Sequence, residues 1–154
     1  MSNPETRLKD LGIALPEPVA PVANYVPYVI SGGQAIISGQ ISIGPDGLIT
    51  GKLGADMDLD AGVDAARACA INLIAQVKAA CDGDLSRVQR VVRLGAFVNS
   101  TPDFIDQPKV VNGASDLMVA VFGDAGRHAR AAVSAPSLPL GAAVEIDGVF
   151  ELAS

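Results

Sequence analysis

The sequence lacks several residue types on which catalytic sites often depend. Among 154 residues there is no tryptophan, one histidine and two cysteines, and aromatic residues make up only 4%. With His128 as the single imidazole, no convergent ligand set for zinc or another transition metal can be recognised. No serine lies in the G-x-S-x-G context of a hydrolase nucleophile, and no G-x-G-x-x-G joins a strand to a helix. We therefore predict neither a metal site, a nucleotide site nor a Ser-His-Asp triad.

The two cysteines fall within one predicted helix. Cys69 and Cys81 are twelve residues apart, which at a helical rise of about 1.5 Å per residue separates them by roughly 18 Å. They cannot form a disulfide with each other. We expect both to be small buried hydrophobic residues.

Positive charge is also scarce. The sequence has 11 Lys and Arg residues against 17 Asp and Glu, which gives a net charge of −6. This negative charge disfavours a nucleic acid as partner, because its phosphate backbone would be repelled. The N-terminus has no basic and apolar signal-peptide pattern, and no uncharged apolar run reaches about 18 residues. These absences predict a cytoplasmic protein that binds neither nucleic acid nor membrane.

Hydrophobic residues make up 49% of the chain, enough for the core of one domain spanning residues 1–154. Residues 1–11 can form a short helix. Three prolines between residues 16 and 21 then force an extended connection. We interpret residues 1–20 as an N-terminal proline-containing arm.

The remaining pattern predicts strands and helices in the order β-β-β-α-β-α-β-β. Residues 24–49 predict a small antiparallel meander of three strands. The other expected elements are a helix from Asp58 or Asp60 to about Cys81, a strand within 86–100, a helical turn at Thr101–Pro102, a helix starting near Pro108, and strands at 130–135 and 142–152. This order predicts an α+β fold in which two helices cover one face of a mixed sheet. The other face would be bare, which favours a homo-oligomer.

The charges among these strands allow more than one interpretation. Arg87, Arg90 and Arg93 are expected to solvate an edge or an exposed face. Arg130 opens one strand and Glu145 lies in the middle of the next, so the two could share a cleft if their strands pair or lie close together. Each is equally compatible with a solvent-exposed surface charge. His128 could add a cation to such a cleft, but an exposed turn position is favoured.

Two segments resemble a known family. The run R-A-A-V-S-A-P-S-L-P-L-G-A-A-V-E-I at 130–146 and the run A-I-I-S-G-Q-I-S-I at 35–43 are similar to motifs of the RidA family, also called YjgF or endoribonuclease L-PSP. The tyrosine that this family places fifteen residues before the glutamine of S-G-Q falls on Tyr25, and its helical asparagine best matches Asn112. The resemblance covers roughly residues 20–152.

The resemblance implies a chorismate-mutase-like fold, assembled as a homotrimer with clefts between subunits. It also implies cofactor-free deamination of reactive 2-imino acids to 2-keto acids and ammonia. In that reaction Arg130 would bind the substrate carboxylate, and Glu145 would position or deprotonate the attacking water. Tyr25, Ser38 and Asn112 would line the cleft.

Two alternatives remain beside imine deamination. A trimer with the same cleft could bind a small carboxylate metabolite without turning it over. A ribonuclease, as the older family name suggests, is disfavoured by the negative charge and by the absence of a histidine pair. The chain also departs from a typical member in its arm, in its longer 108–128 segment and in the pair His128-Ala129 before Arg130.

Overall fold

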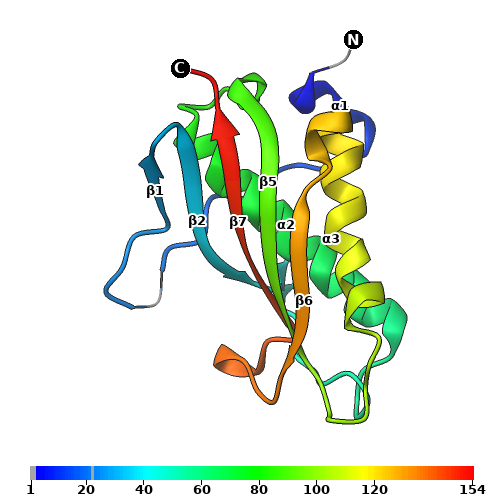
Figure 1. The fold of residues 1–154 in the computed structure, drawn as a ribbon. Helices are drawn as coiled ribbons and strands as arrows, with labels where there is room; N and C mark the ends of the chain where they lie inside the picture. The colour runs from blue at the N-terminus through cyan, green and yellow to red at the C-terminus, as the bar shows by residue number, and fades with distance from the viewer. Residues whose placement is uncertain (1–2, 22) are drawn as a thin grey trace.

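A five-stranded mixed sheet with two long helices on one face forms the body of the molecule (Figure 1). The computed structural model describes residues 3–21 and 23–154. The strands, in their order across the sheet, are β1 (Tyr28–Ser31), β2 (Gln34–Ile41), β7 (Val144–Leu152), β5 (Val88–Asn99) and β6 (Ala129–Ala135). All neighbours are antiparallel except β5 and β6, which are parallel. The predicted α+β class is confirmed.

The two covering helices are α2 (Leu59–Ala80) and α3 (Gln107–Phe122). The side chain of Asp58 caps α2 by accepting a hydrogen bond from Ala61 N at 2.8 Å, as the sequence predicts. Pro108 lies in the first turn of α3, where its missing N–H costs nothing. The predicted turn at Thr101–Pro102 is present as a single turn, in which Phe104 N donates to Thr101 O at 3.2 Å, and it is separate from α3.

The short elements lie around this body. They are the helix α1 (Pro4–Asp10), the strands β3 (Ile43–Gly44) and β4 (Gly47–Leu48), and the 3-10 turns η1 (Leu85–Arg87), η2 (Gly123–Gly126) and η3 (Pro139–Gly141). The predicted third strand of the meander corresponds to β3 and β4, which form a separate ladder. It cannot join the main sheet beside β2, because β1 and β7 already occupy both edges of β2.

Hydrogen bonds attach the arm to the body near its start and near its end. Near its start, Glu5 of α1 accepts a hydrogen bond from Leu85 N at 2.8 Å, and α1 lies beside α3 (Figure 1). Near its end, the buried side chain of Gln76 on α2 donates to Val19 O at 2.8 Å. The extended segment between these points therefore has a fixed path over the body.

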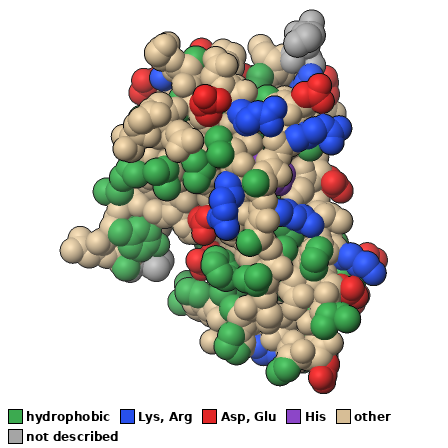
Figure 2. All heavy atoms as spheres, viewed as in Figure 1, with side chains coloured by type: hydrophobic (Ala, Val, Ile, Leu, Met, Phe, Trp, Pro, Cys, Tyr) green, Lys and Arg blue, Asp and Glu red, His purple; other side chains and the backbone are tan. Residues whose placement is uncertain are grey.

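The sheet face opposite the helices is uncovered in one chain. Its exposed apolar side chains, drawn in green in Figure 2, include Val29, Ile36, Phe97 and Val133, which are 38–47% exposed. This agrees with the expectation of a bare face. Because β5 is an inner strand, its arginines do not mark an edge, and Arg93 is on the exposed face instead.

Cys69 and Cys81 are buried and free, as expected. The Cys69 thiol lies 3.4 Å from Val144 O, within reach of a weak S–H hydrogen bond, and burial raises its pKa. Across residues 3–21 and 23–154, no helix combines the length and apolar character needed to cross a membrane.

Candidate functional site

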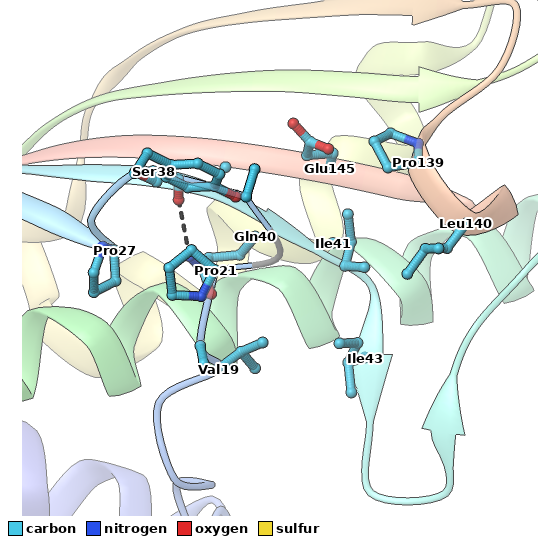
Figure 3. A pocket seen from close by; sticks show the side chains of 14 residues that line it. Val19, Pro21, Pro27, Ser38, Gln40, Ile41, Ile43, Pro139, Leu140 and Glu145 are labelled. Atoms are coloured by element: carbon cyan, nitrogen blue, oxygen red, sulfur yellow. Dashed lines mark hydrogen bonds between the residues drawn. The ribbon is translucent and has the colours of Figure 1, made fainter.

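A cavity of about 460 Å³ lies between the arm, β2, β7 and η3 (Figure 3). Most of its walls are apolar, and the polar side chains in its lining come from Tyr25, Ser38, Gln40 and Glu145. The complete lining is Val19, Ala20, Pro21, Ala23, Tyr25, Pro27, Ser38, Gly39, Gln40, Ile41, Ile43, Pro139, Leu140 and Glu145. Three of the five predicted site residues, Tyr25, Ser38 and Glu145, thus line one cavity.

Glu145 reaches this cavity from the open face of the sheet, where its register partners are Ile41 on β2 and Phe97 on β5. Burial raises the pKa of its carboxyl group, and the nearby carboxylate of Asp147 raises it further. The carboxylate lies directly over Gly39: a Cβ atom there would be 2.5 Å from Glu145 Oε2. A glycine in the S-G-Q motif therefore makes the space that the carboxylate occupies.

Ser38 and Tyr25 are connected through the loop that precedes β1. The β2–β7 register shifts between Ile37 and Gln40, and this bulge turns Ser38 toward the loop. Ser38 Oγ donates to Val26 O at 2.8 Å, and Ser38 N donates to Pro27 O at 2.9 Å. Tyr25, 47% exposed, lies immediately before Val26 and lines the cavity. The serine hydroxyl therefore holds the loop that positions the tyrosine.

Arg130 lies on a different face of the sheet from Glu145. It is on the edge strand β6 and shares its face with its register partner Leu94, which is fully buried under the helices. Its guanidinium donates from Nη1 to Ser115 Oγ at 3.0 Å and from Nη2 to Pro108 O at 3.2 Å, both on α3. β6 and β7 do not pair, because β5 lies between them. A shared cleft formed by direct pairing of these two strands is therefore excluded.

Asn112 lies with Arg130 rather than with the cavity. It occupies an exposed position on α3 between the two residues that hold the guanidinium, Pro108 and Ser115. The predicted site residues therefore separate into two groups in one chain. Tyr25, Ser38 and Glu145 form one group, and Asn112 and Arg130 form the other.

The prediction that His128 is an exposed turn residue is wrong. The ring is half-buried, with Nδ1 at 2.6 Å from Gly126 O and Nε2 at 2.9 Å from Ser115 Oγ. Burial lowers the pKa of the ring and the positive charge of Arg130 lowers it further, against an opposing contribution from the Gly126 carbonyl. Sequence periodicity gave no sign of Ser115, because it becomes a partner only when α3 packs beside β6.

Asp147 is a second carboxylate that sequence reasoning missed. It lies two residues after Glu145, and strand alternation alone places both on one face. Asp147 lies opposite Gly95 on β5 and forms a 3.9 Å ion pair with Arg93. Burial raises the pKa of Asp147, whereas Arg93 and the Gly95 N–H lower it. Within residues 3–21 and 23–154, no group of three or more His, Cys, Asp or Glu side chains could hold a metal.

This fold and these motifs agree with the comparisons to known proteins. Residues 5–152 match the family described as "YjgF/chorismate mutase-like, putative endoribonuclease", so the chain belongs to that family. It is 53% identical over 149 residues to Protein TCP17 of Trypanosoma cruzi, covering 94% of this chain and 91% of that protein.

Two solved structures extend the comparison. A protein of Shewanella oneidensis MR-1 described as "a putative endoribonuclease" is 41% identical, with a TM-score of 0.94, over 98% of this chain and 100% of its own. The structure of E. coli TdcF, solved with bound serine, is 25% identical, with a TM-score of 0.62, over 88% of this chain and 92% of its own.

Proposed function

We propose that this protein hydrolyses reactive 2-imino acids, and the enamines in equilibrium with them, to 2-keto acids and ammonia without a cofactor. The observation that carries the proposal is Glu145, a carboxylate of raised pKa on the wall of a mainly apolar cavity. A carboxylate whose pKa lies closer to neutrality is a stronger general base than an ordinary glutamate. The resemblance of residues 130–146 to the RidA motif supports the same assignment.

The reaction needs a positioned substrate and one proton acceptor. Glu145 takes a proton from water while the water oxygen bonds to the imine carbon. The proton then passes to the nitrogen of the carbinolamine, the C–N bond breaks, and ammonia leaves as the hydroxyl group loses its proton to form the ketone. Because a protonated imine is already electrophilic, positioning and a base contributing about 10²–10⁴-fold are sufficient.

Arg130 is suited to bind the substrate carboxylate. A guanidinium has five N–H donors, of which Ser115 and Pro108 engage two. The remaining donors suffice for a two-bond grip on a carboxylate, which fixes its orientation better than a lysine ammonium would. Asn112 lies beside this position on α3.

In this proposal, assembly of the protomers brings the two groups of residues together and so completes each site. Three copies form a ring in which the β6 edge of one protomer lies beside the arm and β2 of the next. Each substrate then contacts Arg130 and Asn112 of one protomer and Tyr25, Ser38 and Glu145 of its neighbour. The uncovered apolar sheet face supports an oligomer, and a heterologous contact of this kind closes into a ring.

A coupled assay tests the activity. A dehydratase generates 2-aminoacrylate or 2-iminobutanoate, and release of the 2-keto acid is followed with and without the protein. We expect acceleration that is abolished by Glu145→Gln and by Arg130→Lys, each of which should leave the oligomer intact. Keto-acid release equal to that in buffer would overturn the deaminase proposal.

Mixing the two variants tests the shared site. If each site combines Arg130 of one protomer with Glu145 of the next, co-assembled 1:1 mixtures regain about a quarter of the native sites, since each residue is present at half of the positions. Activity that stays at the level of the separate variants, in mixtures shown by mass spectrometry to be mixed, would contradict an inter-subunit site.

A second candidate function is binding of a small carboxylate metabolite without turnover. The bound serine in the E. coli TdcF structure favours it, since an amino acid has the carboxylate and nitrogen of a 2-imino acid. Retained binding of serine or a small keto acid, together with no acceleration in the coupled assay, would support this candidate over the enzyme.

A further inference from the structure

A second cavity, of about 530 Å³, lies between the arm, β3 and α2, and the proposed reaction does not use it. Its lining is Leu11, Gly12, Ile13, Ala14, Pro16, Glu17, Val19, Ile43, Gly44, Pro45, Arg67, Ala68, Ile71 and Asn72. This volume lies within the range of small-molecule sites, which typically combine apolar walls with a few polar groups.

The walls of this second cavity are fixed without a ligand. At one end of the arm segment, Ile13 N donates to Leu8 O at 2.9 Å, and at the other end Val19 O accepts from Gln76. On the opposite wall, Asn72 Nδ2 donates to Ile43 O at 2.9 Å. These hydrogen bonds hold the walls of the cavity in place before a ligand binds, which lowers the entropic cost of binding.

Arg67 is the unusual member of the lining. Its side chain is half-buried on α2, yet it has no hydrogen bond or ion pair with any of the residues 3–21 and 23–154. A guanidinium with five unused donors at the wall of a cavity is well placed to bind a carboxylate. Glu17, the other charged side chain of the lining, does not form an ion pair with Arg67 among the described residues. One cation and one anion therefore remain available to a ligand.

We propose that this second cavity binds an α-amino acid with a large apolar side chain. Arg67 contacts the carboxylate of the ligand and Glu17 contacts its ammonium group. The apolar side chain of the ligand packs among Leu11, Ile13 and Ile71. A zwitterion accounts for both unpaired charges, whereas a simple carboxylate would leave Glu17 facing an anion.

The second cavity shares part of its lining with the first cavity. Val19 and Ile43 line both cavities, and in Figure 3 both lie on the side of the first cavity away from Glu145. A ligand that packs against these two residues restricts the arm that also forms a wall of the first cavity. Any effect of this ligand on turnover rests on the proposed deaminase function, whereas the binding of the ligand does not.

Methyl NMR of the complete protein tests the binding. The chain is labelled at isoleucine and leucine methyl groups and titrated with L-leucine to millimolar concentrations. Ile13 and Ile71 line only the second cavity, whereas Ile41 and Leu140 line only the first. We expect saturable shifts at Ile13 and Ile71. Shifts confined to Ile41 and Leu140, or no shifts, would overturn the proposal whether or not the protein is a deaminase.

Two analogues of leucine test the role of each charge. 4-Methylpentanoate lacks the ammonium group, and 3-methylbutylamine lacks the carboxylate. We expect leucine to bind more tightly than either, and Glu17→Gln to remove its advantage over 4-methylpentanoate. Equal binding of leucine and 4-methylpentanoate to the native protein would overturn the amino-acid assignment.

Arg67→Gln removes the cation, and we expect it to weaken leucine binding about tenfold or more, the effect of losing a charge-assisted hydrogen bond. Lys78→Gln is the matched control, because it removes a positive charge from the same helix outside the cavity. Arg67→Lys keeps the charge and should weaken binding less. Comparable affinity in Arg67→Gln and the native protein, with both spectra folded, would overturn the proposal.

Discussion

Arg130 and Ser115 are joined by a hydrogen bond of 3.0 Å from the guanidinium Nη1 to the serine Oγ. The same Oγ lies 2.9 Å from Nε2 of His128, whose Nδ1 lies 2.6 Å from Gly126 O. A carbonyl oxygen can only accept, so Nδ1 carries the proton, and Nε2 of the neutral ring accepts from the serine hydroxyl. The orientation of Arg130 therefore depends on a serine, and that of the serine on a neutral histidine.

Ser115→Ala removes the acceptor that orients Arg130. We expect KM for the imino acid to rise about five- to tenfold with little change in kcat, since the loss of one hydrogen bond impairs positioning of the carboxylate-binding group. Steady-state kinetics in the coupled assay measures both constants. Ser137→Ala, at an exposed serine, should change neither. An unchanged KM in Ser115→Ala would show that this contact does not position Arg130.

His128 should make stability depend on pH. Its pKa is lower in the folded protein than in the unfolded chain, so below about pH 6.5 the unfolded state binds more protons and stability falls as pH falls. Because the ring is half-exposed, solvent screening keeps this effect small. Urea unfolding at pH 7.5 and 5.5 should show a smaller loss in His128→Gln than in the native protein. Equal losses would contradict the lowered pKa.

The sequence predicted the elements of the fold well because their signals are local. The Asp58 cap, the proline in the first turn of α3 and the alternation in β5 are readable within a few residues. Whether the predicted third meander strand joins the main sheet could not be predicted from local signals, because it depends on which strand occupies the second edge of β2. That strand is β7, more than a hundred residues further along the chain.

In the candidate site too, local features could be predicted from the sequence, whereas features that depend on the whole fold could not. The strand pattern pointed to Arg130 and Glu145 and the resemblance supplied their roles, but the parallel pairing of β6 with β5, which separates them, is a property of the whole sheet. Asp147 was accessible from alternation alone. Ser115 was not, because it contacts His128 and Arg130 only after α3 packs against the sheet.

Asp147→Asn should change the pH dependence of catalysis. The carboxylate of Asp147 raises the pKa of Glu145, so its removal lowers that pKa and keeps Glu145 ionised at lower pH. We expect the acidic limb of the kcat/KM profile to move to lower pH, because the base must be ionised to accept a proton. Asp103→Asn, an exposed substitution outside the cavity, is the control. A limb that does not move would show that Asp147 does not influence the catalytic base.

Gly39→Ala tests the space that the Glu145 carboxylate occupies. The added Cβ would lie 2.5 Å from Glu145 Oε2, so the carboxylate has to move away from its position in the cavity. We expect kcat/KM to fall by about tenfold or more, since small displacements of a catalytic group are costly. At Gly44, where the nearest atom would be at 3.4 Å, alanine should have little effect. Similar activity in both variants would contradict this geometry.

Glu145→Gln should stabilise the protein while it abolishes activity. Because burial raises the pKa of Glu145, the folded state binds more protons than the unfolded state between the ordinary and the raised pKa, and stability falls as pH rises through that range. Above it, the native protein carries the full cost of a half-buried charge, which glutamine avoids. We expect the Tm of Glu145→Gln to exceed that of the native protein by a few degrees at pH 8, and this advantage to shrink toward pH 4.

Differential scanning calorimetry at the two pH values measures the effect, and Glu151→Gln is the matched control because Glu151 is exposed on the same strand. The coupled assay should show a loss of about 10²–10⁴-fold in kcat for Glu145→Gln and little change for Glu151→Gln. A lower Tm for Glu145→Gln at pH 8 would mean that the carboxylate makes stabilising contacts in the native assembly. The cost of burying it would then be offset by a partner that a single chain does not provide, such as the Arg130 of a neighbouring copy.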